Sequence, residues 1–341
     1  MVASKQLLKD EERAFRETIE GLYPGLLGMF PIEQYVTTLQ DKDPHVPYEL
    51  FPSSIIEDLN QIKVEYGPAA SALYHKCSLC RFMQDTLDKL DRDPLPRAIR
   101  EAYGSWFNRI TEDFRTQPDS YYNIDRTLWP LRKDIGICSG RSIPIGGAWV
   151  IEKRLLARRA MIRRASRRRR NGTSARMYSS TALRKSLANI MRPLGITNTA
   201  RHVIRAIRRR LTNHDVCYVI HTIERNILDF SAEQMDLAYR NLASFLEKRS
   251  NVWGVYRSSW FLDPAVGDIS PGMAFLVQVP LDNGAELHDD GPCPDSGIRK
   301  ATMMSLERNR LYTSGEYVPR NFFYFWPRDR IIVAFGNDHD M

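Results

Sequence analysis

Apolar side chains in the first third of the chain recur at the spacing of an amphipathic helix, and turns containing proline separate these stretches. The pattern predicts helices over residues 5–22, 53–66, 68–90 and 95–116. We therefore predict a helical N-terminal region that covers residues 1–130.

Later in the chain, short β-branched and aromatic runs alternate with helical stretches. Strands are expected as a pair within 135–151, singly at 216–223 and 252–261, and as a pair around the Pro-Arg-Asp turn within 321–335. Helices are expected over 231–249, 271–279 and 296–313. The helix over 231–249 is long enough to return the chain across a sheet, so the strands that flank it should be parallel. Residues 131–341 are thus predicted to form an α/β (α+β) domain with a mixed sheet.

Charge is concentrated in one segment that interrupts this domain at about residues 153–210. The segment contains 19 Lys and Arg and no Asp or Glu, so a formal net charge of +8 leaves −11 on the rest of the chain. Like charges repel and no apolar stripe anchors the segment, so we expect residues 165–180 to be mobile. Clustered guanidinium groups bind phosphates, which makes this segment a candidate anion-binding arm. Its candidate ligands are Arg163, Arg164, Arg167 and Arg168. Pairing with the protein's own acidic body is an equally weighted alternative.

The apolar pattern and the cysteines indicate in which cellular compartment the protein is expected. No run of about 18 uncharged apolar residues occurs, so no membrane partner is expected. Five cysteines show no spacing typical of a disulfide framework, which favours a reducing cytoplasm. His75, Cys77 and Cys80 have metal-ligand chemistry, but a structural zinc site needs four ligands and no second pair follows at a suitable spacing. We expect buried cysteines and no metal.

Candidate catalytic residues follow the strand predicted at 216–223. An imidazole at His221 could act as a general base that Glu224 orients, although a histidine hydrogen-bonded in the core is the more common case. Ser259, Trp260 and Asp263 end the next strand and are candidate substrate-binding residues. Because parallel strands place their carboxyl ends together, His221 and Asp263 should lie at one crevice.

The usual signatures of several enzyme classes are missing. The sequence contains no Gly-x-Ser-x-Gly elbow, no Walker motif, no Gly-x-Gly-x-x-Gly and no kinase signature. Hydrolase, nucleoside-triphosphatase and Rossmann oxidoreductase functions therefore lack their usual support.

Several stretches resemble an uncharacterised family of bacterial proteins over about residues 120–335. They are Lys133-Asp-Ile-Gly-Ile-Cys138, Ile143-Pro-Ile-Gly-Gly147, Ser259-Trp-Phe-Leu-Asp-Pro264, Ile269-Ser-Pro271, Asn283-Gly-Ala285, Arg310-Leu-Tyr-Thr-Ser-Gly315 and Trp326-Pro-Arg328. The predicted element order is also similar to the GNAT acyltransferase fold, with 216–223 as the central strand and 252–261 as its splayed partner. One departure is that residues 225–230 contain no glycine, unlike the GNAT pyrophosphate loop.

The resemblance implies an acyltransferase that moves an acyl group from an acyl-CoA or acyl-carrier-protein donor to an amine or hydroxyl. The donor would bind between the strands that end at Ile223 and Phe261, with His221 or Glu224 as the base and Tyr312 as the acid that protonates the leaving thiolate. The acceptor would be a small molecule or a carrier protein. The alternative is a protein that binds RNA or tRNA through the arginine-rich segment.

Overall fold

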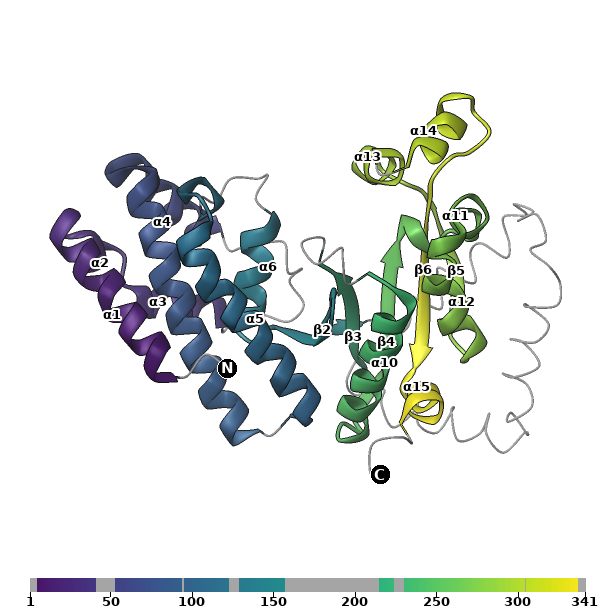
Figure 1. Ribbon diagram of the computed structural model, residues 1–341, viewed down its shortest axis with the longest axis horizontal. Coiled ribbons are helices and arrows are strands. Elements are labelled where there is room, and N and C mark those ends of the chain that lie inside the picture. The colour runs from purple at the N-terminus through teal and green to yellow at the C-terminus, as the bar shows by residue number, and fades with distance from the viewer. Residues whose placement is uncertain are drawn as a thin grey trace. The chain divides into compact units, whose positions relative to one another are not determined.

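The computed structural model describes residues 5–40, 53–93, 95–122, 129–156, 215–223, 230–303 and 305–336. These residues form a mixed α/β structure with a helical N-terminal region and one six-stranded sheet, which confirms the predicted fold class (Figure 1). They divide into two compact units: Met1–Lys153 with His221–Asn241, and Arg154–Ile220 with Leu242–Met341. A domain boundary at residue 130 stays a prediction, and the predicted mobile segment 165–180 lies outside the described residues.

Helices dominate the first unit, and α1, α4 and α5 lie where the apolar spacing predicts helices. They are α1 (Lys5–Leu22), α2 (Leu26–Met29), α3 (Ile32–Gln40), α4 (Ser53–Arg92), α5 (Arg97–Thr116), the 3₁₀ turn η1 (Asp119–Tyr122) and α6 (Trp129–Cys138). Within α4 the backbone leaves helical geometry at Gly67, with φ at 88° and ψ at 171°. Glycine adopts this positive φ without a Cβ clash, and Pro68 then restarts the helix. The two helices predicted on either side of Gly67 are therefore confirmed.

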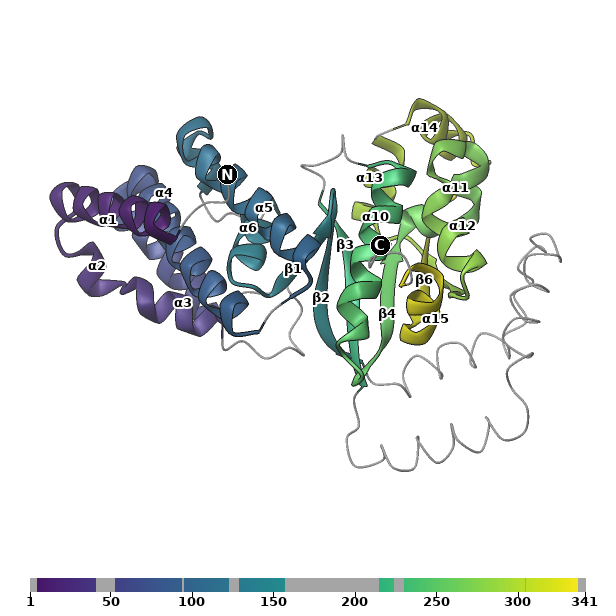
Figure 2. The ribbon, with the colours of Figure 1, turned by 60° about the horizontal axis from the view of Figure 1, so that its bottom comes forward.

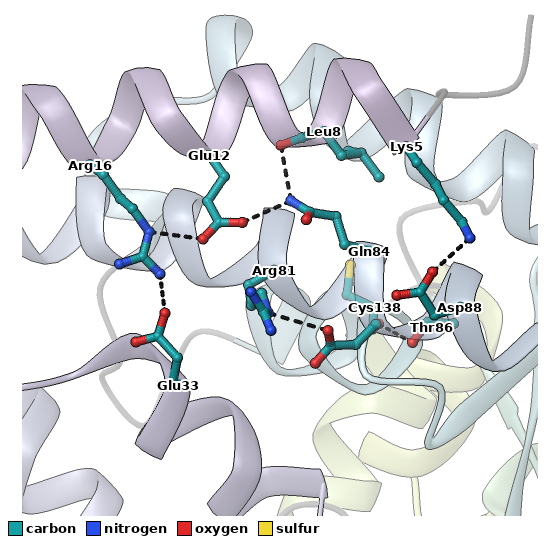
Figure 3. A network of polar contacts seen from close by, with 11 residues as sticks. Lys5, Leu8, Glu12, Arg16, Glu33, Arg81, Gln84, Thr86, Asp88 and Cys138 are labelled. Carbon is teal, nitrogen blue, oxygen red and sulfur yellow. Dashed lines mark hydrogen bonds and ion pairs between the residues drawn. The ribbon is translucent and has the colours of Figure 1, made fainter.

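A buried polar network fixes α1 on α4 (Figure 3). The Glu12 carboxylate is 8% exposed and accepts hydrogen bonds from Gln84 Nε2 at 2.8 Å and Arg16 Nε at 2.8 Å. Gln84 Nε2 also donates to the Leu8 carbonyl at 3.2 Å, and Arg16 Nη2 reaches Glu33 of α3 at 2.5 Å. Since the buried side chains of Glu12 and Gln84 both have partners, the network costs little desolvation and sets the register of α1 along α4.

The first unit continues into a hairpin of β1 (Ser142–Gly146) and β2 (Trp149–Leu156), which pair antiparallel. Gly146 and Gly147, with φ at 129° and 49°, supply the positive φ that their tight turn needs. The strand pair was expected to begin near Ile135, but that prediction is wrong, because residues 135–138 belong to α6. Leu131, Ile135, Ile137 and Cys138 are all buried, so this helix is enclosed on more than one side.

All six strands form one sheet in the order β1-β2-β3-β4-β6-β5. The remaining strands are β3 (Asp215–Thr222), β4 (Val252–Ser259), β5 (Glu286–Pro292) and β6 (Arg320–Pro327). β3 and β4 run parallel, as predicted, with α10 (Ala232–Glu247) as their connection. Their register runs from Val216 and Val252 to Val219 and Tyr256, whereas β4 and β5 both pair antiparallel with β6.

The second unit buries an aromatic core along β6. Tyr324 and Trp326 are fully enclosed, and Trp326 Nε1 donates to the Asn283 carbonyl at 2.9 Å. Phe245 of α10 meets Tyr218 of β3 edge-on, with ring centroids 5.1 Å apart. Figure 2 shows α10 and α15 (Arg328–Phe335) beside β4.

The predicted second strand of the C-terminal pair is wrong, because residues 328–335 form the helix α15. Ile331 and Phe335 are buried four residues apart, whereas Val333 is 75% exposed. A half-buried strand would have buried Val333 with them, so the burial follows the helical period and not the strand period. Pro327, just before the first turn, also ends the ladder of β6.

The segment between β4 and β6 is helical apart from β5. Its helices are η4 (Trp260–Leu262), α11 (Pro264–Ile269), η5 (Pro271–Met273), α12 (Phe275–Asp282), α13 (Asp295–Met303) and α14 (Leu306–Thr313). The single helix predicted over 296–313 is divided in two. Ser305 caps the second, since its Oγ accepts the backbone N–H of Arg308 at 3.2 Å.

Candidate active site

His221 lies beside a buried carboxylate in the first unit. Its Nε2 is 3.4 Å from Oε2 of Glu152, and the two side chains are 31% and 5% exposed. Glu152 comes from β2 and His221 from the end of β3, two strands that neighbour each other in the sheet. The structure thus gives the predicted base a carboxylate partner from a distant part of the sequence.

Arg141 approaches the same carboxylate from the loop after α6. Its Nη2 is 3.6 Å from Glu152 Oε1, and the arginine side chain is 16% exposed. The preceding turn is rigid, because Thr86 Oγ1 donates to the Cys138 carbonyl at 2.6 Å (Figure 3). Gly140 has φ at 70°, and a Cβ there would lie 3.2 Å from Thr86 Oγ1. The carboxylate therefore has a cation on one oxygen and an imidazole on the other.

Backbone contacts hold the end of β3 that carries His221. Lys133 Nζ, on the largely buried Lys133, donates to the Thr222 carbonyl at 2.5 Å. The Ile223 N–H donates to the Ala148 carbonyl at 2.7 Å. Both bonds hold the Thr222–Ile223 peptide, which directly follows the histidine. They restrict the backbone that carries the ring, and a catalytic base needs this kind of preorganisation.

The orientation of the imidazole separates its two nitrogens. Nε2 is enclosed, faces Glu152 and lacks a well-aligned hydrogen-bond partner within the described part of the chain. No residue of that part contacts Nδ1 by a hydrogen bond either, and the ring is one-third exposed. A carboxylate beside one nitrogen stabilises the imidazolium that forms when the other nitrogen accepts a proton. The arrangement can support general base catalysis at Nδ1.

The remaining predicted site residues are either outside the described residues or in the second unit. Glu224, Arg163, Arg164, Arg167 and Arg168 fall outside the described residues. Ser259, Trp260 and Asp263 end β4 and begin η4 and α11, and Tyr312, 39% exposed, lies on α14. These four belong to the second unit and His221 to the first, so their common crevice stays a prediction.

Asp263 has a structural task in the second unit. Its Oδ1 accepts the N–H of Ala265 at 3.0 Å and caps α11. The side chain is 2% exposed, and burial raises the pKa of its carboxyl to about 6, while the Arg320 backbone and charge pull in the opposite direction. A carboxyl with this pKa can be protonated or ionised near neutral pH, which is compatible with proton transfer as well as capping.

The histidine and cysteines of α4 are buried in the helical core. His75 is 1% exposed, and Cys77 and Cys80 are fully enclosed, as expected of cysteines on an apolar helix face. Burial lowers the pKa of His75 to about 3 and raises the pKa of Cys77 to about 12. No group of three or more His, Cys, Asp and Glu side chains within the described ranges could hold a metal ion.

Comparisons of the chain with protein-family models, with curated proteins and with solved structures give no match. Among the described helices, none combines the length and the apolar character needed to cross a membrane.

Glu152 and Arg141 were not identified from the sequence. A signal was present, since Glu152 is the lone carboxylate that follows the apolar run 148–151 inside a strand. A charged residue on a buried strand usually has a paired partner. That rule marks Glu152 as unusual, but it cannot name His221 as the partner.

Proposed function

We propose that the chain is an acyltransferase that moves an acyl group from a pantetheine-type thioester to an amine or a hydroxyl. The observation that carries the proposal is the pairing of His221 with buried Glu152 at the carboxyl end of β3. In open α/β sheets this end of a parallel strand is the customary place for a ligand. The parallel arrangement of β3 and β4 around α10 agrees with the resemblance to GNAT enzymes.

The register of the two parallel strands adds support. Pairing is recorded from Val216 to Val219 of β3, whereas β3 itself continues to Thr222 and β4 to Ser259. The strands thus extend beyond their paired stretch, as splayed partners do. The resemblance puts the pantetheine arm of the donor along such a splay.

In the proposed reaction, each of the two catalytic groups transfers one proton. As the acceptor nitrogen or oxygen attacks the thioester carbonyl carbon, its proton passes to Nδ1 of His221, and Glu152 stabilises the resulting imidazolium. The carbon–sulfur bond then breaks, and the leaving thiolate takes a proton, for which Tyr312 remains the predicted donor. Glu152 acts through the histidine, so it is a positioning residue.

Thiol release from acetyl-CoA in the presence of a panel of amines and alcohols tests the proposal. His221→Gln should lower turnover by about 10²- to 10⁴-fold, the usual contribution of a general base, while the protein stays folded. His288→Gln is the matched control, since His288 is 30% exposed and also lies near a glutamate. Absence of transfer in the wild type, or full activity of folded His221→Gln, would refute the assignment.

Nucleic-acid binding is a second candidate, favoured by the 19 basic residues between 153 and 210 and by the lack of acidic residues there. Affinity for mixed RNA that falls steeply between about 50 and 200 mM salt would support it. Binding that is insensitive to salt would count against it. This assay is independent of thiol release, so both activities can be judged separately.

A further inference from the structure

Arg308 on α14 is a charged side chain enclosed by neutral groups in the second unit. It is 3% exposed. Its Nε donates to the Ala301 carbonyl at 2.6 Å, and Nη1 donates to Ser270 Oγ at 2.6 Å and lies 3.6 Å from Met273 Sδ. The guanidinium lies over the ring of Trp260, 5.1 Å from its centroid. Within the described ranges, no carboxylate pairs with it.

A buried guanidinium without a counter-charge is unusual, because fully buried arginines are almost always paired. With 3% of the residue exposed, water solvates this charge poorly, and burial lowers the pKa of Arg308. Of its five N–H donors, those on Nε and Nη1 are directed to the three neutral groups, whereas Nη2 has no hydrogen-bond partner among the described residues. The side chain is thus held in one orientation, and Nη2 remains able to donate to a ligand.

Arg310, on the same helix, shows the ordinary alternative. Its side chain is 58% exposed, and Nη2 pairs with Glu307 Oε1 at 2.8 Å. It is solvated and paired with a carboxylate, so it needs no further ligand.

We propose that Arg308 binds an oxyanion, either a carboxylate or a phosphate group of a ligand, through Nη2 beside the Trp260 ring. Guanidinium groups bind these anions through charge-assisted hydrogen bonds, and a buried setting strengthens each bond. Trp260 is the first residue after β4, so the ring supplies an apolar wall next to the charge. Anion binding here does not depend on acyl transfer at His221.

Calorimetric titration of the full-length protein with sodium phosphate and with sodium acetate, against sodium chloride at equal ionic strength, tests the site. Arg308→Met should raise the apparent Kd of the bound anion by about 10- to 100-fold, the value of a hydrogen bond to a charged group. The matched variant Arg310→Met should leave Kd within about twofold of the wild type. A response to phosphate alone indicates a phosphate ligand, and a response to acetate indicates a carboxylate ligand; either supports the site.

Ser270→Ala provides a second variant in case Arg308→Met does not fold. It removes the hydroxyl that holds Nη1, so Kd should rise several-fold while the charge remains. No binding to the wild type beyond that of chloride, or equal binding by wild type and a folded Arg308→Met, would overturn the proposal. An unchanged Kd in Ser270→Ala would also overturn it.

Discussion

Two histidines, one in each unit, lie near a glutamate at similar distance and with similar exposure, yet their surroundings differ. His221 Nε2 is 3.4 Å from Glu152, and His288 Nε2 is 3.8 Å from Glu286, with the imidazoles 31% and 30% exposed. The glutamates are different: Glu152 is 5% exposed and Glu286 is 47% exposed. Burial of the carboxylate is therefore the variable that separates the pairs.

Burial changes what a carboxylate can do for its histidine. Water screens Glu286, so its attraction for an imidazolium is worth little. Glu152 is shielded from water and has Arg141 near its other oxygen, so its position beside His221 is restricted. His288 instead stacks on Phe323, with centroids 5.0 Å apart. The first pair suits proton transfer and the second suits a packed strand surface.

The largest expected difference between the pairs is in turnover. Glu152→Gln should lower kcat for acyl transfer by at least about 100-fold with KM nearly unchanged, because the orienting charge is lost and the shape of the side chain is kept. Glu286→Gln should change kcat by less than about twofold. Steady-state thiol release measures both, and thermal unfolding checks that each variant is folded. Equal effects of the two substitutions would remove the distinction between the pairs.

A third histidine, His75 in α4, sharpens the comparison, because no carboxylate pairs with it among the described residues. Its folded-state pKa of about 3 lies below the ordinary value of 6.5, so the unfolded chain binds the extra proton first as the pH falls. The wild type should therefore lose stability between pH 6.5 and 3, by about 2 kcal/mol at pH 5.

Urea unfolding at pH 7.5 and pH 5 measures this loss. In His75→Leu the difference between the two pH values should shrink by about that amount, since the proton-binding group is gone. His288→Gln, at an exposed site, is the control and should retain the wild-type difference. A His75→Leu protein with the full wild-type loss would show that another group titrates.

The smallest expected effect concerns a second buried carboxylate. Asp263 has a folded-state pKa of about 6, above its ordinary value, so the stability that it contributes is present below about pH 4 and is lost as the pH rises through 6. Asn keeps the oxygen that caps α11 and does not ionise. Asp263→Asn should be more stable than the wild type by about 1.5 kcal/mol at pH 5 and nearly equal to it at about pH 3.5.

Urea unfolding at the two pH values tests this prediction as well. A variant that is destabilised equally at both would mean that the cap, not the charge, dominates at Asp263. Both carboxylates are near an arginine, Arg320 for Asp263 and Arg141 for Glu152, but Glu152 also lies beside a histidine. The comparison of Asp263→Asn with Glu152→Gln therefore separates a carboxylate that strains the fold from one that serves a site.

Much of the secondary structure could be predicted from the sequence, because neighbouring residues determine local structure. The helix α1 matches its prediction at both ends, and the break in α4 lies at the glycine and proline that marked it. The strand β3, the helix α10 and the strand β4 also lie where their apolar and capping patterns put them. Helical spacing and β-branched runs are short-range signals, and a single sequence contains them.

Only the tertiary structure decided the rest. The segment 328–335 has an apolar run that suits a strand, but packing of Ile331 and Phe335 on the second unit's core makes it a helix. Glu152 and His221 are 69 positions apart, and only strand order brings them together. A sequence identifies His221 as a titratable group at the end of a strand; the carboxylate that it meets depends on long-range pairing, which no local pattern encodes.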